Sequence, residues 1–450
     1  MSMPKFKPPI RGSRQLGQRN AAQALELARS SLAQGDLAAA EKVLSALLKA
    51  LPKQPSALHL MGALHNMRGD SANALTLMQQ AVQLQPQDAN IWNDIGLVYG
   101  RLERVDDAIL AYQRCIALAG KTILAAKALD NLGRLQLQHD ASAAEQSSRQ
   151  ATEFAPGFGL AWYGLAQALI VQDKLENGLQ AALHAVRLMP KSMAREVLAD
   201  VLSKRGHQQA AIDFYQQMLQ DDPDNPRVLH HLKALTDPQS PERASNAYIA
   251  STFDGFAASF DTKLARLHYH APQLVITALA SRYADARNAL DVADVGCGTG
   301  LCGPLLSPWA KSLVGVDLSS GMLDKARQRA VYTELHHMEL CQFLGGQPQA
   351  FDVVVSADTL VYFGDLTEVL AACQHSLRCG GHAFFTVEAL MDDALAHRLA
   401  PHGRYAHSGS HVRDAAQAAG LVLCAIDPHT LRTERGEPVA GWVVSLQKPA

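Results

Sequence analysis

The sequence predicts two kinds of structure, an all-α repeat array in the N-terminal half and a doubly wound α/β domain in the C-terminal half. Three observations support this division. Small residues and helix breakers recur at a spacing of about 34 residues as far as residue 235. From about residue 288, short β-rich runs alternate with helical stretches, and a glycine-rich turn follows the first run. A chain of 450 residues is long enough for both parts.

Composition and charge restrict the classes of function. The formal charge of -2 and the pI near 6.8 give no electrostatic reason to expect a nucleic-acid partner. No stretch approaches the roughly 20 apolar residues that span a bilayer, so no membrane partner is expected. The seven cysteines are scattered without a CxxC pair, which predicts no metal site and is typical of the reducing cytoplasm.

The N-terminal residues 1–20 form a basic arm that contains Lys5, Lys7, Arg11, Arg14 and Arg19 among Pro and Ser. The arm lacks the apolar core of a signal peptide. We therefore expect it to be disordered.

Residues 21–235 contain a repeat in which a small residue is followed twelve positions later by a helix breaker. The pairs are Ala40 with Pro52, Ala74 with Pro86, Ala108 with Gly120, Ala144 with Pro156, Gly178 with Pro190, and Ala211 with Pro223. Successive small residues are 34, 34, 36, 34 and 33 positions apart, which matches the tetratricopeptide (TPR) unit of two helices. The spacing predicts about six repeats, each ended by a residue that cannot continue a helix.

The third repeat resembles the TPR family most clearly, through Trp92, Gly96, Tyr99, Ala108 and Tyr112. Stacked units of this kind bend into a concave surface. The resemblance implies a protein or peptide partner on that surface, although the aromatic residues themselves are expected to pack between helices. Nothing in the sequence identifies the partner or the oligomeric state.

Residues 236–243 are rich in turn residues and predict a linker, so that the second domain covers residues 244–450. Seven strands are expected in that domain, over 290–295, 312–317, 334–340, 351–356, 382–388, 421–427 and 439–447. The last two runs are too close for an intervening helix. They therefore predict a hairpin that adds one antiparallel strand to a mainly parallel sheet.

The strongest chemical signal is the segment DVADVGCGTG at residues 291–300, a strand that leads into a glycine-rich turn. It resembles the first motif of class I S-adenosylmethionine-dependent methyltransferases, a Rossmann-like family. The matching residues are Asp294, Gly296, Gly298 and Gly300. Glycines permit positive φ and close approach of the backbone to a bulky cofactor.

A dinucleotide fingerprint is the alternative, because Gly298, Gly300 and Gly303 also follow the pattern GxGxxG and Asp317 lies 19 residues beyond Gly298. A dinucleotide would bring an anionic pyrophosphate close to Asp294. S-adenosylmethionine instead brings a sulfonium and an ammonium cation. Electrostatics therefore favours the methyl donor.

The resemblance assigns cofactor contacts to four further residues. Asp317, at the end of the second strand, takes the position that binds the ribose hydroxyls. Leu318 and Met322 match positions beside the adenine ring, with packing at a helix start as their other interpretation. Glu339 matches the residue that accepts a hydrogen bond from the adenine amino group.

The resemblance also indicates where the acceptor reacts. Asp358 and Tyr362 follow the fourth strand, which borders the methyl group in this family. Residues 248–261 resemble an aromatic lid helix, and residues 403–408 resemble a loop near the substrate. The candidate catalytic residues are therefore His407 as a general base, Tyr405 and Asp358. A structural role for His407 stays open.

Some acceptor classes are disfavoured. No Asn/Asp-Pro-Pro-aromatic element follows the fourth strand, and no paired glutamates suggest arginine methylation. Three functions stay open. The first is a methyltransferase whose repeats recruit a protein or carrier-bound substrate. The second is a TPR scaffold with a regulatory or inactive cofactor domain, and the third is a small-molecule O-methyltransferase whose repeats mediate assembly.

Overall fold

The chain forms two compact units, Met1–Ser192 and Met193–Ala450. A computed structural model describes residues 11–137, 139–191, 193–238, 242–255, 257, 260–434 and 437–450. None of the helices within these ranges is long and apolar enough to cross a membrane. The boundary between the units lies 43 residues before the predicted end of the repeats at residue 235, so the last predicted repeat shares a unit with the α/β domain.

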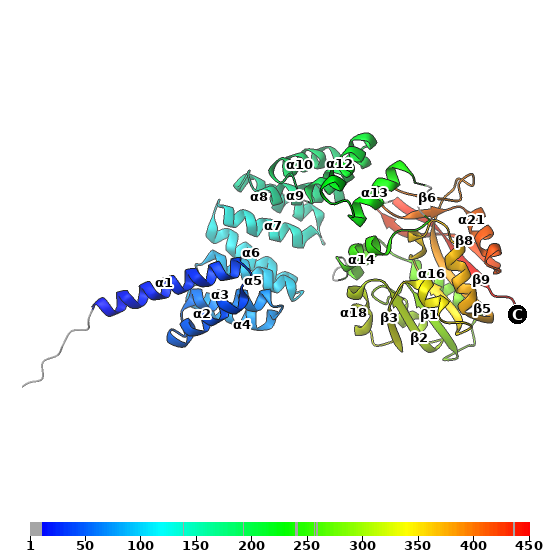
Figure 1. Ribbon diagram of the computed structural model, residues 1–450, viewed down its shortest axis with the longest axis horizontal. Coiled ribbons are helices and arrows are strands. Elements are labelled where there is room, and N and C mark those ends of the chain that lie inside the picture. The colour runs from blue at the N-terminus through cyan, green and yellow to red at the C-terminus, as the bar shows by residue number, and fades with distance from the viewer. Residues whose placement is uncertain are drawn as a thin grey trace, which may run out of the picture. The chain divides into compact units, whose positions relative to one another are not determined.

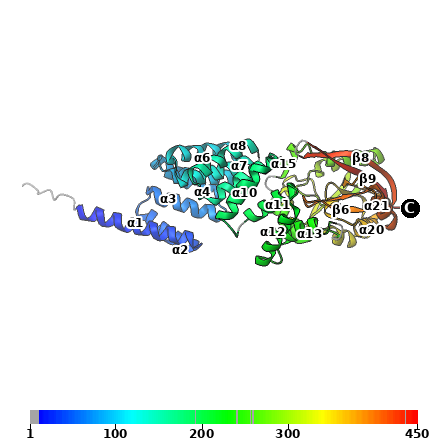
Figure 2. The ribbon, with the colours of Figure 1, turned by 90° about the horizontal axis from the view of Figure 1, so that it is seen from above.

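The first unit consists of helices that pack against their neighbours in chain order, as α6, α7 and α8 do in Figure 2. Its helices are α1 (Arg11–Ala33), α2 (Leu37–Ala50), α3 (Pro55–Met67), α4 (Ser71–Leu84), α5 (Ala89–Arg101), α6 (Val105–Ala119), α7 (Ile123–Leu137), α8 (Ala141–Phe154), α9 (Gly159–Val171) and α10 (Leu175–Leu188). The small residues that mark the repeats, from Ala40 to Gly178, lie buried on the second helix of each pair. These helix pairs agree with the predicted repeat.

Close contact between paired helices requires glycine. A Cβ at Gly62 would lie 2.7 Å from Cγ of Met78, and one at Gly96 would lie 2.6 Å from Cε1 of Tyr112. Both distances are too short for real carbon atoms, so glycine at these positions lets α3 meet α4 and α5 meet α6. The second unit begins with one more pair of repeat helices, over residues 194–221.

Two tryptophans hold equivalent turns in the first unit. The indole Nε1 of Trp92 donates to the carbonyl of Pro86 at 3.0 Å, and that of Trp162 donates to the carbonyl of Pro156 at 2.9 Å. Both therefore fix the chain that enters their helix, in agreement with the expectation that these aromatic residues serve packing.

The N-terminal arm differs from expectation. Residues 1–10 lie outside the described residues, but residues 11–20 are helical and form the start of α1. The prediction of disorder over residues 1–20 is therefore wrong from Arg11 onward. Basic side chains among polar residues do not by themselves prevent a helix, because Arg and Gln are good helix formers.

The second unit begins with α11 (Ala194–Lys204), α12 (Gln208–Asp221) and α13 (Pro226–Thr236). The predicted linker includes residues 239–241, which lie outside the described residues. Three more helices precede the sheet: α14 (Asn246–Asp254), α15 (Phe260–Arg266) and α16 (Ala271–Arg282).

The sheet has the order β3-β2-β1-β4-β5-β7-β6, and β9 pairs antiparallel with both β5 and β8. Its strands are β1 (Leu290–Val295), β2 (Ala310–Asp317), β3 (Glu334–His337), β4 (Phe351–Ser356), β5 (Leu377–Ala389), β6 (His397–Leu399), β7 (Tyr405–His407), β8 (Val422–Glu434) and β9 (Glu437–Gln447). The predicted hairpin of β8 and β9 is confirmed, although residues 435 and 436 of its turn lie outside the described residues.

Two details of the sheet differ from the prediction. β6 and β7 were not predicted, because strands of three residues carry no periodic signal. The predicted strand 334–340 ends at His337, and Glu339 instead caps α19 (Leu340–Gly345). The nine strands that the described residues form therefore include two short ones at the edge beyond β5.

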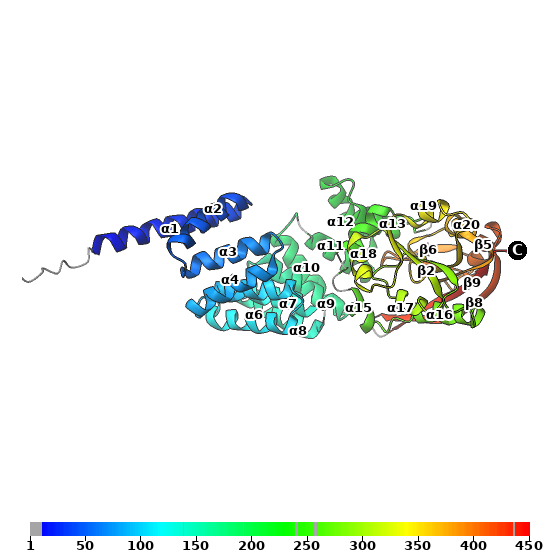
Figure 3. The same cartoon turned by 90° about the horizontal axis from the view of Figure 1, so that it is seen from below.

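Helices cover both faces of the sheet (Figure 3). One core joins it to α19, α20 (Thr367–Ser376) and α21 (Gly409–Ala418). The other joins it to α16 and α17 (Gly303–Leu306). The remaining helix after β2 is α18 (Ser320–Gln328). A parallel sheet buried on both faces leaves its carboxyl ends free to bind a ligand.

Candidate functional site

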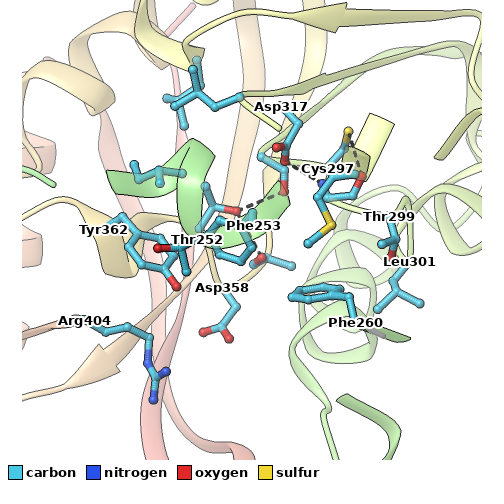
Figure 4. A pocket seen from close by; sticks show the side chains of 18 of the residues that line it. Thr252, Phe253, Phe260, Cys297, Thr299, Leu301, Asp317, Asp358, Tyr362 and Arg404 are labelled. Atoms are coloured by element: carbon cyan, nitrogen blue, oxygen red, sulfur yellow. Dashed lines mark hydrogen bonds between the residues drawn. The ribbon is translucent and has the colours of Figure 1, made fainter. Parts of the chain in front are cut away.

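A cavity of about 470 Å³ lies at the carboxyl ends of β1, β2 and β4. The predicted cofactor residues line it, except for Gly300. We call the part whose lining residues come from the segments 294–302, 316–322 and 338–340 the glycine half. The part lined by Arg227, His231, residues 357–363 and residues 402, 404, 432 and 434 is the charged half. Figure 4 shows residues of both halves around one space.

The turn after β1 depends on glycine at three positions with positive φ. Gly296 has φ of 71°, and a Cβ there would lie 2.2 Å from Cγ2 of Thr359. Gly298 has φ of 55°, and its nearest neighbour would be 3.9 Å away. Gly300 has φ of 83° and packs against Tyr332, away from the cavity. Only Gly298 thus offers bare backbone to a ligand, while the other two shape the turn.

Asp317 ends β2 and is fixed by the main chain. Its Oδ2 accepts from the backbone N–H of Gly298 at 2.8 Å, and its Oδ1 accepts from that of Ser319 at 2.8 Å. Burial raises the pKa of this carboxyl group. Each carboxylate oxygen keeps a lone pair beyond these bonds, so Asp317 can accept two hydroxyl hydrogens from a sugar in the cavity.

Asp294 lies in β1 below the turn and is 1% exposed. It accepts a hydrogen bond from the hydroxyl of Tyr332 at 2.6 Å. Burial, together with the nearby charge of Asp317, raises the pKa of Asp294 to about 7. A cationic ligand would stabilise the ionised form, whereas an anionic pyrophosphate would oppose it.

Four apolar side chains line the glycine half of the cavity: Leu318, Met322, Met338 and Leu340. Glu339 also lines it, but its oxygens already have partners. Its Oε2 accepts from the N–H of Gln342 at 2.8 Å, and its Oε1 accepts from Nη1 of Arg243 at 3.0 Å. These bonds hold the carboxylate in place and leave each of its oxygens a lone pair for a further donor.

Two helices that precede the sheet, α14 and α15, are attached to the glycine half by aspartates. Asp254 of α14 accepts from the hydroxyl of Ser319 at 2.6 Å. Asp261 of α15 accepts from the hydroxyl of Thr299 and from Nη2 of Arg329 at 2.5 Å. The aromatic residues of these helices, among them Phe253 and Phe260, line the cavity, as the proposed lid requires (Figure 4).

The charged half contains an ion network of Asp358, Glu388, Arg404, Arg432 and Glu434. Arg432 is 2% exposed and donates to all three carboxylates: to Asp358 at 2.9 and 3.0 Å, to Glu434 at 2.7 Å, and to Glu388. Arg404 donates to Glu388 and Glu434, each at 2.6 Å. Three carboxylates against two guanidinium groups leave one net negative charge when all are ionised.

The network holds Asp358 in an unusual backbone conformation. Its φ of 56° lies in the left-handed region, which is costly for a residue with a side chain. Its N–H donates to Oγ1 of Thr386 at 2.8 Å. Burial raises the pKa of Asp358, and Arg432 opposes that rise. For Glu388 and Glu434, burial is outweighed by Arg404 and Arg432, which lower the pKa of both.

Sequence reasoning missed most of this network. Glu388 was placed only as the end of a predicted strand, and β8 was predicted to stop at residue 427, before Arg432 and Glu434. The available signal was that Arg432 and Glu434 are two residues apart, which puts both side chains on one face of a strand. Charged residues at such positions inside a β-rich run are expensive unless they are paired.

The prediction of His407 and Tyr405 as catalytic residues is not supported. Both are 0% exposed, and neither lines the cavity. His407 donates from Nε2 to the carbonyl of Phe363 at 2.8 Å, and burial lowers its pKa to about 3. The ring of Tyr405 packs in a cluster with Ala234 and Leu399. Tyr405 and His407 are two residues apart in β7, so both side chains lie on the same face of the strand and point into the core.

The loop before β7 instead brings His402 to the cavity. Its side chain is 43% exposed, and its Nδ1 accepts weakly from the N–H of Arg404 at 3.4 Å. Surrounding protein, and then the charge of Arg404, lowers the pKa of His402 to about 4. The imidazole is therefore neutral near pH 7.

Together these features define a doubly wound domain with a cavity at the carboxyl ends of its strands, where a fixed carboxylate lies beside a glycine turn. The comparisons with known proteins agree. Residues 292–381 match the family described as methyltransferase domain. Residues 25–89 and 67–121 match the family described as tetratricopeptide repeat. The N-terminal half of the chain thus contains tetratricopeptide repeats, and its C-terminal half contains a segment of the methyltransferase domain family.

Individual relatives are similar over shorter parts. A ubiquinone biosynthesis O-methyltransferase of Coxiella burnetii is 31% identical over 98 residues, which cover 21% of this chain and 42% of that protein. The chain thus spans about two fifths of the length of that relative. A methyltransferase structure from Mesorhizobium loti is 20% identical, with a TM-score of 0.31, and covers 38% of this chain and 96% of its own. The structure of Pseudomonas aeruginosa pilF is 12% identical, with a TM-score of 0.43, and covers 47% of this chain and 96% of its own.

Proposed function

We propose that the protein transfers the methyl group of S-adenosylmethionine to an acceptor in the charged half of the cavity, and that its TPR repeats recruit a protein or carrier-bound acceptor. The observation that carries this proposal is the continuity of the cavity. The turn at Gly298 and the carboxylate of Asp317 share one space with Asp358, Tyr362 and Arg404. A molecule in the charged half therefore lies directly beside a nucleoside in the glycine half.

The residues of the glycine half fit this cofactor. Asp317 would hold the ribose, the apolar side chains of Leu318 and Met322 would hold adenine, and Asp294 would favour the positive charge. Bound S-adenosylmethionine supplies a methyl group already activated by its positive sulfur. The protein then has to align the nucleophile with that carbon and exclude water.

Aromatic rings and the ion network perform these two tasks. Phe253 meets Phe260 and Tyr362 edge to face, with ring centroids 6.0 and 5.5 Å apart, and these rings shield the space between the two halves. Glu434, which Arg404 and Arg432 keep ionised, is 30% exposed at the cavity. It can accept a hydrogen bond from the acceptor and orient it.

A second candidate is O-methylation of a small molecule, with repeats that serve assembly. The similarity to ubiquinone biosynthesis O-methyltransferases, proteins named for such a reaction, favours this candidate. Both candidates share the cofactor and differ in the acceptor. A third possibility from the sequence, a scaffold with an inactive domain, would show no methyl transfer.

Calorimetry tests the site. Asp317→Ala should weaken S-adenosylmethionine binding about 10-fold to 100-fold, because two hydrogen bonds to a charged acceptor are lost. Asp324→Ala is the matched control, since Asp324 is 69% exposed on the following helix. Equal affinity in Asp317→Ala and wild type would refute the assignment of the ribose site.

Labelled methyl transfer tests the reaction. Full-length protein is incubated with methyl-labelled S-adenosylmethionine and an extract of the source cells, which is then separated into protein and small-molecule fractions. Label in the protein fraction supports recruitment by the repeats, and label only in small molecules supports the second candidate. Cofactor binding without any transfer would favour the scaffold.

A further inference from the structure

The helix α13 belongs both to the repeat pattern and to the cavity wall. It follows the last pair of repeat helices, yet it lies in the same compact unit as the sheet. Two of its side chains, Arg227 and His231, line the charged half. In Figure 1, α13 lies beside the edge of the sheet at β6.

α13 also holds the loop that supplies the neighbouring wall. His230 is 5% exposed and donates from Nε2 to the carbonyl of Gly403 at 2.9 Å. Its ring stacks on Tyr248 of α14, with centroids 3.9 Å apart. His231 contacts the carbonyl of Pro401 through Nδ1 at 3.3 Å. The bonded loop carries His402 and Arg404, so α13 builds one wall of the cavity and positions another.

The four arginines that line the cavity differ in how firmly their charges are paired. Arg432 has three carboxylate partners, Arg404 has two, and Arg243 binds Glu339 at 3.0 Å and also Asn246. Among the described residues Arg227 pairs with Glu196 of α11 at 3.3 Å, and its side chain is 51% exposed.

The ion pair of Arg227 is therefore the weakest of the four. Exposed single ion pairs contribute little to stability, so little holds Arg227 to Glu196. In addition, Glu196 does not line the cavity. Arg227 is thus the cation at the wall that is most available to a ligand.

We propose that the methyl acceptor contacts the last repeat helix, and that Arg227 binds an anionic group of the acceptor, a carboxylate or a phosphate, away from the methylated atom. This inference rests on the proposed methyl transfer and deepens it. It assigns α13 a part in acceptor specificity, in addition to any recruitment by the preceding repeats. A guanidinium group suits either anion because it can donate two parallel hydrogen bonds.

The test measures the initial rate of label transfer from S-adenosylmethionine as a function of the amount of cell extract. Arg227→Ala should raise the amount needed for half-maximal rate about tenfold, with a similar maximal rate. Arg227→Lys, which keeps the charge, should recover part of the loss. Lys233→Ala is the control, because Lys233 is exposed on the same helix and does not line the cavity. Separation of the labelled extract distinguishes a protein-bound anion from a small molecule.

Two measurements separate failure of this inference from failure of the proposed function. S-adenosylmethionine affinity and the thermal midpoint should be unchanged in Arg227→Ala, which shows that the variant is folded. Normal transfer with an unchanged half-saturating amount, or an equal effect of Lys233→Ala, would overturn the role of Arg227 alone. Wild-type protein that binds the cofactor but transfers no label would overturn the proposed function, and this inference with it.

Discussion

The glycine half of the cavity comes from residues 294–340, and its key contacts are made by main-chain groups, such as the bond from Gly298 to Asp317 across 19 positions. The charged half draws on α13, the end of β4, the loop before β7, and β8. Its contacts join side chains as far apart as Asp358 and Arg432, 74 positions. Under the proposed function, local backbone geometry thus serves the cofactor, while long-range ion pairs shape the site for the acceptor.

The largest effect should follow from breaking the ion network. Arg432→Met would leave Asp358, Glu388 and Glu434 without their shared partner, and uncompensated buried charge costs about 3–5 kcal/mol of unfolding free energy. Denaturant unfolding measures this cost. Arg327→Met, which alters a 56% exposed residue, should stay within about 0.5 kcal/mol. A cost below about 1 kcal/mol for Arg432→Met would mean that the network does not hold the charged half together.

His407 lies next to the charged half, where it bonds to the carbonyl of Phe363, and it should make stability depend on pH. Its pKa in the folded protein is about 3, against an ordinary value of 6.5, so the unfolded chain binds more protons between these values. Stability from this residue is therefore present above pH 6.5 and is lost as pH falls, by about 1.4 kcal/mol per unit. When the pH is lowered from 6.5 to 5, the free energy of unfolding of His407→Asn should fall by about 2 kcal/mol less than that of the wild type, as measured by urea unfolding. Equal losses would mean that His407 is charged in the folded state.

Gly296 tests the glycine half. Gly296→Ala places a Cβ against Thr359 at positive φ, so the turn must shift, and S-adenosylmethionine affinity should fall at least about tenfold. Gly380→Ala is the control, with φ of 77° and nothing within 4 Å of the new Cβ. It should cost roughly 1 kcal/mol of stability and leave affinity unchanged. If both variants bind normally, the close contact with Thr359 does not fix the turn.

The smallest effect is a pH dependence of binding. Asp294 has a pKa of about 7 in the free protein, and a cationic ligand favours its ionised form. Protons therefore compete with the ligand, and S-adenosylmethionine affinity should fall by up to about tenfold from pH 8 to pH 6. S-adenosylhomocysteine, which lacks the sulfonium charge, should change less, and Asp294→Asn should flatten the profile. Parallel profiles for both ligands would place the sulfonium away from Asp294.

The same contrast explains how much the sequence could predict. Asp294, Gly298 and Asp317 were assigned correctly to the cavity, because a strand, a glycine turn and the next strand end fix their positions locally. His407 was predicted to face the substrate, but it points into the core, because the sequence alone does not show which side chains of a three-residue strand face the cavity. The sequence does not predict that Arg227 lines the cavity, because its position depends on how α13 packs on residues 400–404.

The place of β9 between β5 and β8 gives the folding of this domain an order. Among the described residues β8 pairs with β9 alone, so the hairpin of β8 and β9 has to lie against β5 for Arg432 to reach Asp358. The turn at Gly298 needs only nearby strands, and contacts of short sequence separation form fastest. We therefore expect a refolding intermediate that already binds the nucleoside while acceptor recognition is still missing, which stopped-flow mixing with each ligand would resolve.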